Sequence, residues 1–135
     1  MSVIVTDTGF APDDFTGAIV AIDAMSGEET ALDVPSDADA DALAPHLGQV
    51  ALIRVAFPKH ADGRGFTIAR RLRRMGYAGR LRAAGHVLAD QYAMARRSGF
   101  DEVEIDDALA ARQPEDQWRA RANWRAHDYQ ARLRG

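Results

Sequence analysis

Residues 50–66 read VALIRVAFPKHADGRGF, and the interpretation of the whole chain starts from this stretch. An apolar run leads into a polar loop that contains two glycines, and an amphipathic segment follows directly. In α/β proteins this order places polar side chains at the carboxyl end of a parallel strand, which is where such folds bind ligands. The stretch therefore predicts a ligand-binding edge of a sheet.

The chain around this stretch alternates between strand and helix patterns. The run 49–57 is apolar except for Arg54, as expected of a central parallel strand. Helices that follow are predicted from their apolar spacing and from Gly76 and Gly99, which can end them. Short loops between these elements indicate right-handed crossovers and a parallel βαβαβ core, 49–106. The predicted elements are a strand at 49–57, a helix at 65–77, a strand at 79–85, a helix at 87–100 and a strand at 101–106.

The segments outside this core have weaker patterns. Short β-like runs and turn signals predict an N-terminal β arm, with candidate strands at 3–6, 17–23 and 31–34. Residues 36–47 predict a short acidic helix with Ser36 or Asp37 as its N-cap. Residues 108–135 predict a helical tail divided near Pro114. We expect one α/β domain, 1–135, whose core resembles part of a βα barrel.

Composition and charge restrict the classes of function. The chain of 135 residues has no cysteine, which excludes disulfides, thiolate metal sites, iron–sulfur ligation and thiol redox chemistry in it. No run of 18 apolar residues and no signal-peptide pattern occurs, so we expect a cytoplasmic protein without a membrane partner. Residues 1–62 carry two basic and eleven acidic side chains, whereas 63–135 carry fifteen arginines and nine acidic side chains. The arginine-rich half could face an acidic protein, an anionic small molecule or, least of all, nucleic acid.

Polar residues at the ends of the predicted strands are the candidate ligand-binding residues. Loop glycines let a backbone approach a ligand closely, and a helix N-terminus favours an anion. An arginine beside such a terminus could clamp a sulfate, phosphate or carboxylate with two hydrogen bonds. The candidates are Lys59, Asp62, Gly63, Arg64, Gly65, Arg82, His86, Asp90 and Gln91.

Each of these residues also has a purely structural interpretation. Asp62 is equally suited to cap a helix, and the two loop glycines to turns with positive φ. Arg82 and Asp90 could form a structural ion pair, and the spacing of His86 and Asp90 permits a local hydrogen bond. Structure alone and a ligand site therefore remain open alternatives for this loop.

Other recognisable chemistry is missing from the sequence. The acidic pattern 37–41 lacks the later glycine and glutamate of a calcium loop, and the four histidines lack the spacing of a zinc site. No nucleophile elbow, phosphate loop or dinucleotide fingerprint occurs. We therefore expect no metal and no resident cofactor, and we assign no catalytic residue.

Three stretches carry a resemblance to a known family: FPKHADGRGFT (57–67), GYAGRLRAAGHVLADQ (76–91) and RSGFD (97–101). In these motifs residues 57–106 resemble the core of the bacterial domain-of-unknown-function family 934. Two positions depart from its pattern: His86 stands where the family usually has aspartate, and His60 where an aromatic residue is common. If that aspartate were catalytic in the family, this chain would be altered at it.

The resemblance implies a role in sulfur metabolism. Genes of the family typically lie beside those for sulfite reductase, and its members are accordingly labelled oxidoreductases involved in sulfite reduction. We expect an accessory protein of assimilatory sulfite reduction that binds an oxyanion or docks sulfite reductase or its acidic electron carrier. One alternative is an oxidoreductase or other small enzyme with its site at Asp62-Gly63-Arg64-Gly65. The other is a structural module that forms a homo-oligomer.

Overall fold

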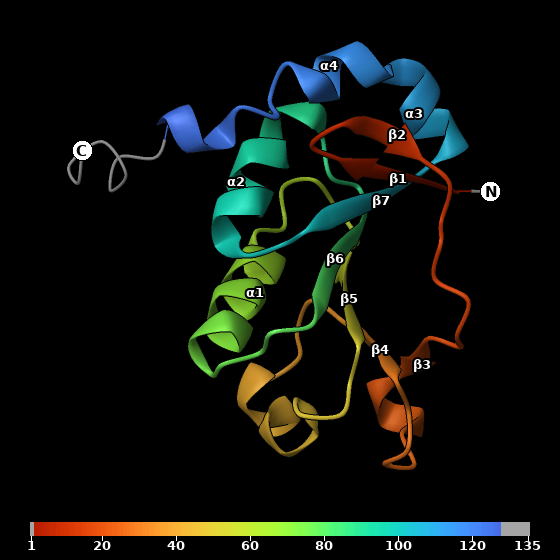
Figure 1. The fold of residues 1–135 in the computed structure, drawn as a ribbon, viewed down its shortest axis with the longest axis vertical. Coiled ribbons are helices and arrows are strands. Elements are labelled where there is room, and N and C mark those ends of the chain that lie inside the picture. Colours follow the sequence, from red (N-terminus) through yellow and green to blue (C-terminus); the bar gives the residue numbers. More distant parts are fainter. Residues whose placement is uncertain (1, 128–135) are drawn as a thin grey trace.

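The computed structural model describes residues 2–127 and contains one seven-stranded sheet, in the order β2-β1-β7-β6-β5-β4-β3 (Figure 1). The strands are β1 (Ser2–Thr6), β2 (Gly9–Ala11), β3 (Val20–Ala21), β4 (Ala31–Val34), β5 (Leu52–Phe57), β6 (Arg80–Gly85) and β7 (Glu102–Asp106). The α-helices are α1 (Arg64–Arg74), α2 (Tyr92–Ser98), α3 (Asp107–Arg112) and α4 (Glu115–Arg119). Short 3₁₀ helices are η1 (Ile22–Ala24), η2 (Ala40–His46), η3 (Ala89–Gln91) and η4 (Trp124–His127).

Strands β3 to β7 are parallel and lie side by side in chain order, which confirms the predicted parallel core. The N-terminal β arm joins the same sheet, because β1 pairs with β7 and with β2, in both cases antiparallel. Within residues 2–127 the sheet is open, with β2 at one edge and β3 at the other, and does not close into a barrel.

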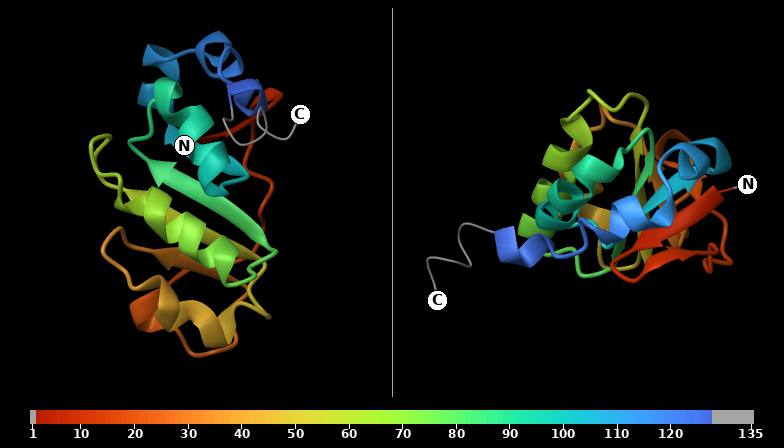
Figure 2. Two further views of the ribbon diagram at one scale, coloured as in Figure 1. Left: turned by 90° about the vertical axis from the view of Figure 1, so that its left-hand side faces the viewer. Right: turned by 90° about the horizontal axis from the view of Figure 1, so that it is seen from above.

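The helices after β5 and β6 cover a single face of the sheet (Figure 2). When successive parallel strands are neighbours, crossovers of one hand return each helix to the same side. Alternate strand residues turn apolar side chains to this face, and α1 packs its buried stripe on them. The shared core includes Ile53, Val55, Phe57, Phe66, Ile68, Ala69, Leu72, Leu81, Ala83, Val103 and Ile105.

The opposite face of the sheet is charged, which differs from the strand buried on both sides that the apolar run 49–57 predicts. Arg54, Arg82 and Glu104 alternate with the core residues and lie on this face. The chain between β2 and β3 runs along it (Figure 1), and Asp13 ties that segment to Arg82. Ion pairs here take the place of a second layer of helices.

Two of the described helices begin at a later residue in the structure than the sequence predicts. The helix predicted at 36–47 is the 3₁₀ helix η2, and its N-cap is Asp39, not Ser36 or Asp37. Pro45 lies inside this segment and has no N–H, which disfavours a regular α-helix. The helix predicted at 87–100 starts as η3 and becomes α2 at Tyr92. Gly76 and Gly99 end their helices with positive φ, as predicted.

The tail contains two short helices on either side of Pro114, as predicted, up to residue 127; residues 128–135 lie outside the described part of the chain. Trp118 is 1% exposed. Its ring packs edge-to-face with the Tyr92 ring, and the two ring centroids are 6.2 Å apart. The tail is also fastened to β2, because the backbone N–H of Phe10 donates to Glu115 at 2.7 Å. Trp118 is therefore a core anchor.

In the 62–65 loop, Gly65 is required by packing, and neither glycine is required by a positive φ. Neither Gly63 nor Gly65 has a positive φ, which corrects that interpretation. A Cβ at Gly65 would lie 2.5 Å from the Phe57 ring, because α1 approaches β5 at this point. The absence of a side chain at residue 65 sets the distance between helix and strand.

Replacing Gly65 by alanine should therefore destabilise the fold. Overpacking costs about 1–3 kcal/mol and exceeds the gain in helix propensity of up to about 1 kcal/mol, so we expect a net loss of about 1–2 kcal/mol. Urea unfolding followed by circular dichroism measures it. Gly48→Ala is the control, because no atom lies within 4 Å of its Cβ position. An equally stable Gly65→Ala variant would contradict this account.

Candidate functional site

The loop after β5 fixes the side chain of Arg64 at the start of α1. The Asp62 carboxylate accepts hydrogen bonds from the Arg64 backbone N–H at 3.2 Å, from its Nε at 2.9 Å and from its Nη2 at 2.8 Å. These bonds hold the pKa of Asp62 well below its usual range. The carboxylate is therefore ionised at neutral pH and fills the anion-binding position that the sequence predicts for a ligand.

Arg64 also reaches across to the end of β4. Its Nη2 donates to the Ser36 hydroxyl at 3.0 Å, while the side chain remains 60% exposed. An open hollow of about 330 Å³ lies beside it, lined by Ser36, Asp37, Ala38, Arg64, Thr67 and Ile68. The guanidinium is thus oriented by protein groups and still accessible.

The loop after β6 is tied to the loop after β5. The Gln91 side chain donates to the His60 carbonyl at 2.6 Å and accepts from the Leu88 N–H at 2.9 Å. The His86 N–H donates to the Phe57 carbonyl at 2.8 Å. Lys59 and His86 are exposed at the same edge. The structure therefore brings these predicted site residues together around a fixed pair of loops.

Arg82 does not lie at this edge, which corrects the predicted set. It occupies the middle of β6 with no exposed surface, because strand alternation turns it to the charged face. It donates to Glu102 at 2.6 Å, to Glu104 at 2.8 Å and to Asp13 at 3.1 Å. The suggested pairing of Arg82 with Asp90 is wrong.

Asp90 is likewise engaged outside the loop edge. Its carboxylate pairs with Arg121 from the C-terminal segment at 2.8 Å, and both side chains are more than half exposed. Sequence spacing suggests His86 as a local partner, but the described contact of Asp90 joins η3 to the residues after α4. Asp90 therefore belongs to the attachment of the tail.

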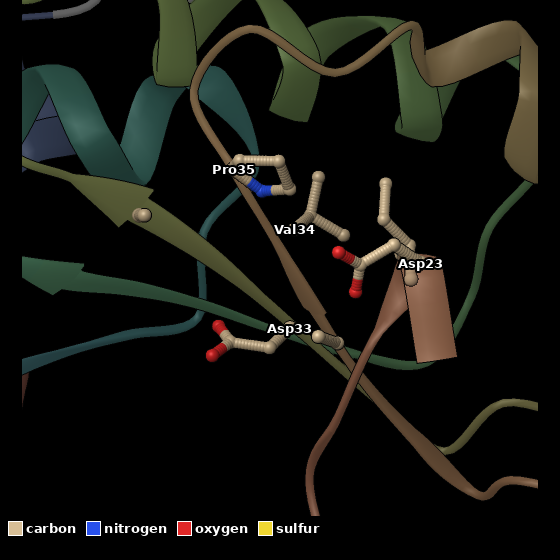
Figure 3. Close-up of a pocket in the computed structure, with 7 residues that line it drawn as sticks. Asp23, Asp33, Val34 and Pro35 are labelled. Carbon is tan, nitrogen blue, oxygen red and sulfur yellow. The ribbon is translucent and has the colours of Figure 1, made fainter. Parts of the chain in front are cut away.

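A second hollow lies at the carboxyl ends of β3, β4 and β5, where the sequence predicts no site (Figure 3). It measures about 390 Å³ and is lined by Ala21, Ile22, Asp23, Asp33, Val34, Pro35 and Ala56. The only local signal was an aspartate within or directly after each short β-like run. The sequence pattern does not specify which strands pair with each other, so it does not show on which side of the sheet these aspartates lie.

Asp33, which lines this hollow, is paired with Arg54 on the charged face of the sheet. Arg54 holds Asp33 with two hydrogen bonds, from Nε at 3.2 Å and from Nη2 at 3.0 Å, and also contacts Glu104 at 3.3 Å. The hydrogen bonds with Asp33 raise the pKa of Arg54 above its ordinary value. Asp33 is thus a fixed member of the ion-pair network.

Among residues 2–127 there is neither a helix that could cross a membrane nor a group of metal-binding side chains. No helix within 2–127 has the length and apolar character needed to cross a membrane. Within the same residues, no three histidine, cysteine or acidic side chains are grouped so that they could hold a metal ion. The candidate functional site is the carboxyl edge of the parallel strands, with the Arg64 loop and the hollow beside Asp23 as its two parts.

Comparison with known proteins gives one match. A family model described as a bacterial protein of unknown function (DUF934) matches residues 31–135, which include the parallel strands from β4 onward and the Arg64 loop. No curated protein and no solved structure matches the chain.

Loss of Arg82 should damage stability severely. Arg82→Ala would leave Glu102 and Glu104 without their buried cation, and breaking a buried ion pair costs about 3–5 kcal/mol. Chemical unfolding measures the change. Arg71→Ala is the matched control, because its pair with Asp41 is exposed to solvent and should contribute little to stability. Equal losses in the two variants would contradict the structural role of Arg82.

Proposed function

The chain belongs to the bacterial DUF934 family of unknown function, and we propose that it is an accessory protein that binds a small oxyanion through Arg64. The resemblance described above suggests assimilatory sulfite reduction as the setting. Sulfite or a related sulfur oxyanion is then the ligand class, and sulfite reductase or its acidic electron carrier is the partner. Binding, not turnover, is the proposed activity.

The state of the Arg64 guanidinium is the observation that supports this proposal. Nε and Nη2 are engaged by Asp62 and Ser36, whereas Nη1 makes no hydrogen bond to any described residue. Arg64 and Thr67 both line the open hollow, and the hydroxyl of Thr67 is a second group that could bind an oxyanion. Because the arginine is already oriented, a ligand loses little of its binding free energy to ordering that side chain.

Because of Asp62, a ligand bound at the proposed site would be released readily. Its carboxylate balances the charge of Arg64, so an incoming oxyanion competes with an internal anion. This competition favours modest affinity, which suits a protein that delivers a ligand to a partner. A group with a pKa far below neutrality is also a poor general base, which disfavours the enzyme alternative at this loop.

The outer face of α1 supports docking to an acidic partner. Arg70 and Arg74 are exposed and form no ion pair with the described residues, while Arg71 is paired with Asp41. Exposed charges of one sign steer an oppositely charged protein and fix its orientation. The free arginines lie on the same helix that Arg64 begins, so a docked partner would sit near the oxyanion.

Thermal unfolding with sulfite, sulfate or phosphate tests the proposed site. A ligand at about 100 times its dissociation constant should stabilise the wild-type protein by about 2.7 kcal/mol. Arg64→Ala should lose this stabilisation, because it removes the guanidinium. Asp62→Asn should bind the anion more tightly than the wild type, because it removes the competing carboxylate.

Arg70→Ala is the control, since it removes an exposed arginine from the same helix without touching the loop. It should keep the full anion-dependent stabilisation. The proposal is overturned if neither the wild type nor Asp62→Asn responds to any of the three anions. It is also overturned if Arg64→Ala and Arg70→Ala respond equally.

A further inference from the structure

The hollow at the carboxyl ends of β3, β4 and β5 is separate from the Arg64 loop, and both charged side chains in its lining are aspartates. We propose that it binds a small organic cation, a molecule with one ammonium or guanidinium group on a short apolar body. This inference does not rest on the oxyanion proposal, because no residue is shared between the linings of the two hollows.

The shape and walls of the hollow suit a small molecule. Its volume of about 390 Å³ falls within the range of ligand pockets, about 300–1,000 Å³. Most of its lining is apolar, contributed by Ala21, Ile22, Val34, Pro35 and Ala56. It also lies at the end of the parallel strands where open α/β sheets bind ligands. An apolar body of a ligand would contact these walls.

The polar groups in the hollow call for a single positive charge. Asp33 is held by Arg54, and in Figure 3 the Asp23 carboxylate extends from η1 toward β4 while that of Asp33 turns away from it. Asp23 has no hydrogen bond or ion pair with any described residue. The hollow therefore contains one carboxylate that a protein cation does not neutralise, and an ammonium or guanidinium would complete a charge-assisted hydrogen bond there.

The charged groups in the lining favour a cation over an oxyanion. Both are aspartates, and Asp33 is already paired with Arg54. The attraction for a cation within the hollow therefore comes from Asp23, which would repel an anion. A bound metal ion is a poorer fit, because calcium requires six to eight oxygen ligands. No group of three metal-binding side chains occurs among residues 2–127.

Isothermal titration calorimetry with benzylamine and butylamine as probes tests this inference on the full chain. Both amines should bind the wild-type protein, whereas benzyl alcohol, which has a similar shape without the charge, should not. Asp23→Asn should weaken amine binding by about tenfold or more, since it removes the charge of the hydrogen-bond acceptor. Because Asp23 has no partner in the described structure, this variant should fold normally.

Two controls separate the possible results. Glu28→Gln removes an exposed acidic side chain from the segment between η1 and β4 that is not in the lining, and should change amine affinity by less than about twofold. Arg64→Ala should bind amines like the wild type, so failure of the oxyanion proposal is distinguishable from failure of this one. Ala56→Leu should reduce binding by filling the hollow.

The inference is overturned by any of three results. The first is that neither amine binds the wild-type protein. The second is that Asp23→Asn and Glu28→Gln bind the amines equally. The third is that benzyl alcohol binds as tightly as benzylamine, which would show that the hollow does not select a positive charge.

Discussion

The buried guanidinium of Arg82, surrounded by three carboxylates, is the interaction on which the rest of the structure depends. Parallel strands laid down in chain order place their helices on one face and leave the other without a covering layer. Here ion pairs close that face. Glu102 and Glu104 join β7 to β6, and Asp13 secures the segment that crosses the sheet. Arg54 extends the same network to Asp33 at the hollow between β3 and β5.

The parallel core was predictable because its signals are local. Apolar runs, amphipathic spacing and closing glycines lie within single elements, and a short loop between two elements fixes their neighbour relation. The pairing of β1 with β7 was not predictable, since it joins residues about a hundred positions apart. Arg82, on the charged face, shows the same limit. Alternation predicts that it faces away from Leu81, but not that three distant carboxylates meet it there.

The candidate site was predicted in part for the same reason. Residues 62 and 64 are close in sequence, so their proximity follows from the loop itself, although its consequence differs from expectation because Asp62 occupies the guanidinium. The hollow beside Asp23 required β3 and β4 to be placed next to β5, which is information that only the sheet provides. The acidic first half and the arginine-rich second half thus meet at one edge, where Ser36 and Asp37 line the same hollow as Arg64.

The most direct test of this account is a titration of the ¹⁵N-labelled wild-type protein with sulfite, followed by NMR amide shifts. A site at the Arg64 loop predicts saturable shifts confined to residues that line its hollow, 36–38, 64, 67 and 68, and to Asp62, which is bonded to Arg64. Shifts spread over the exposed arginines of α1 would indicate non-specific attraction. Such shifts, or none at all, would contradict the claim that the carboxyl edge of this sheet holds a defined oxyanion site.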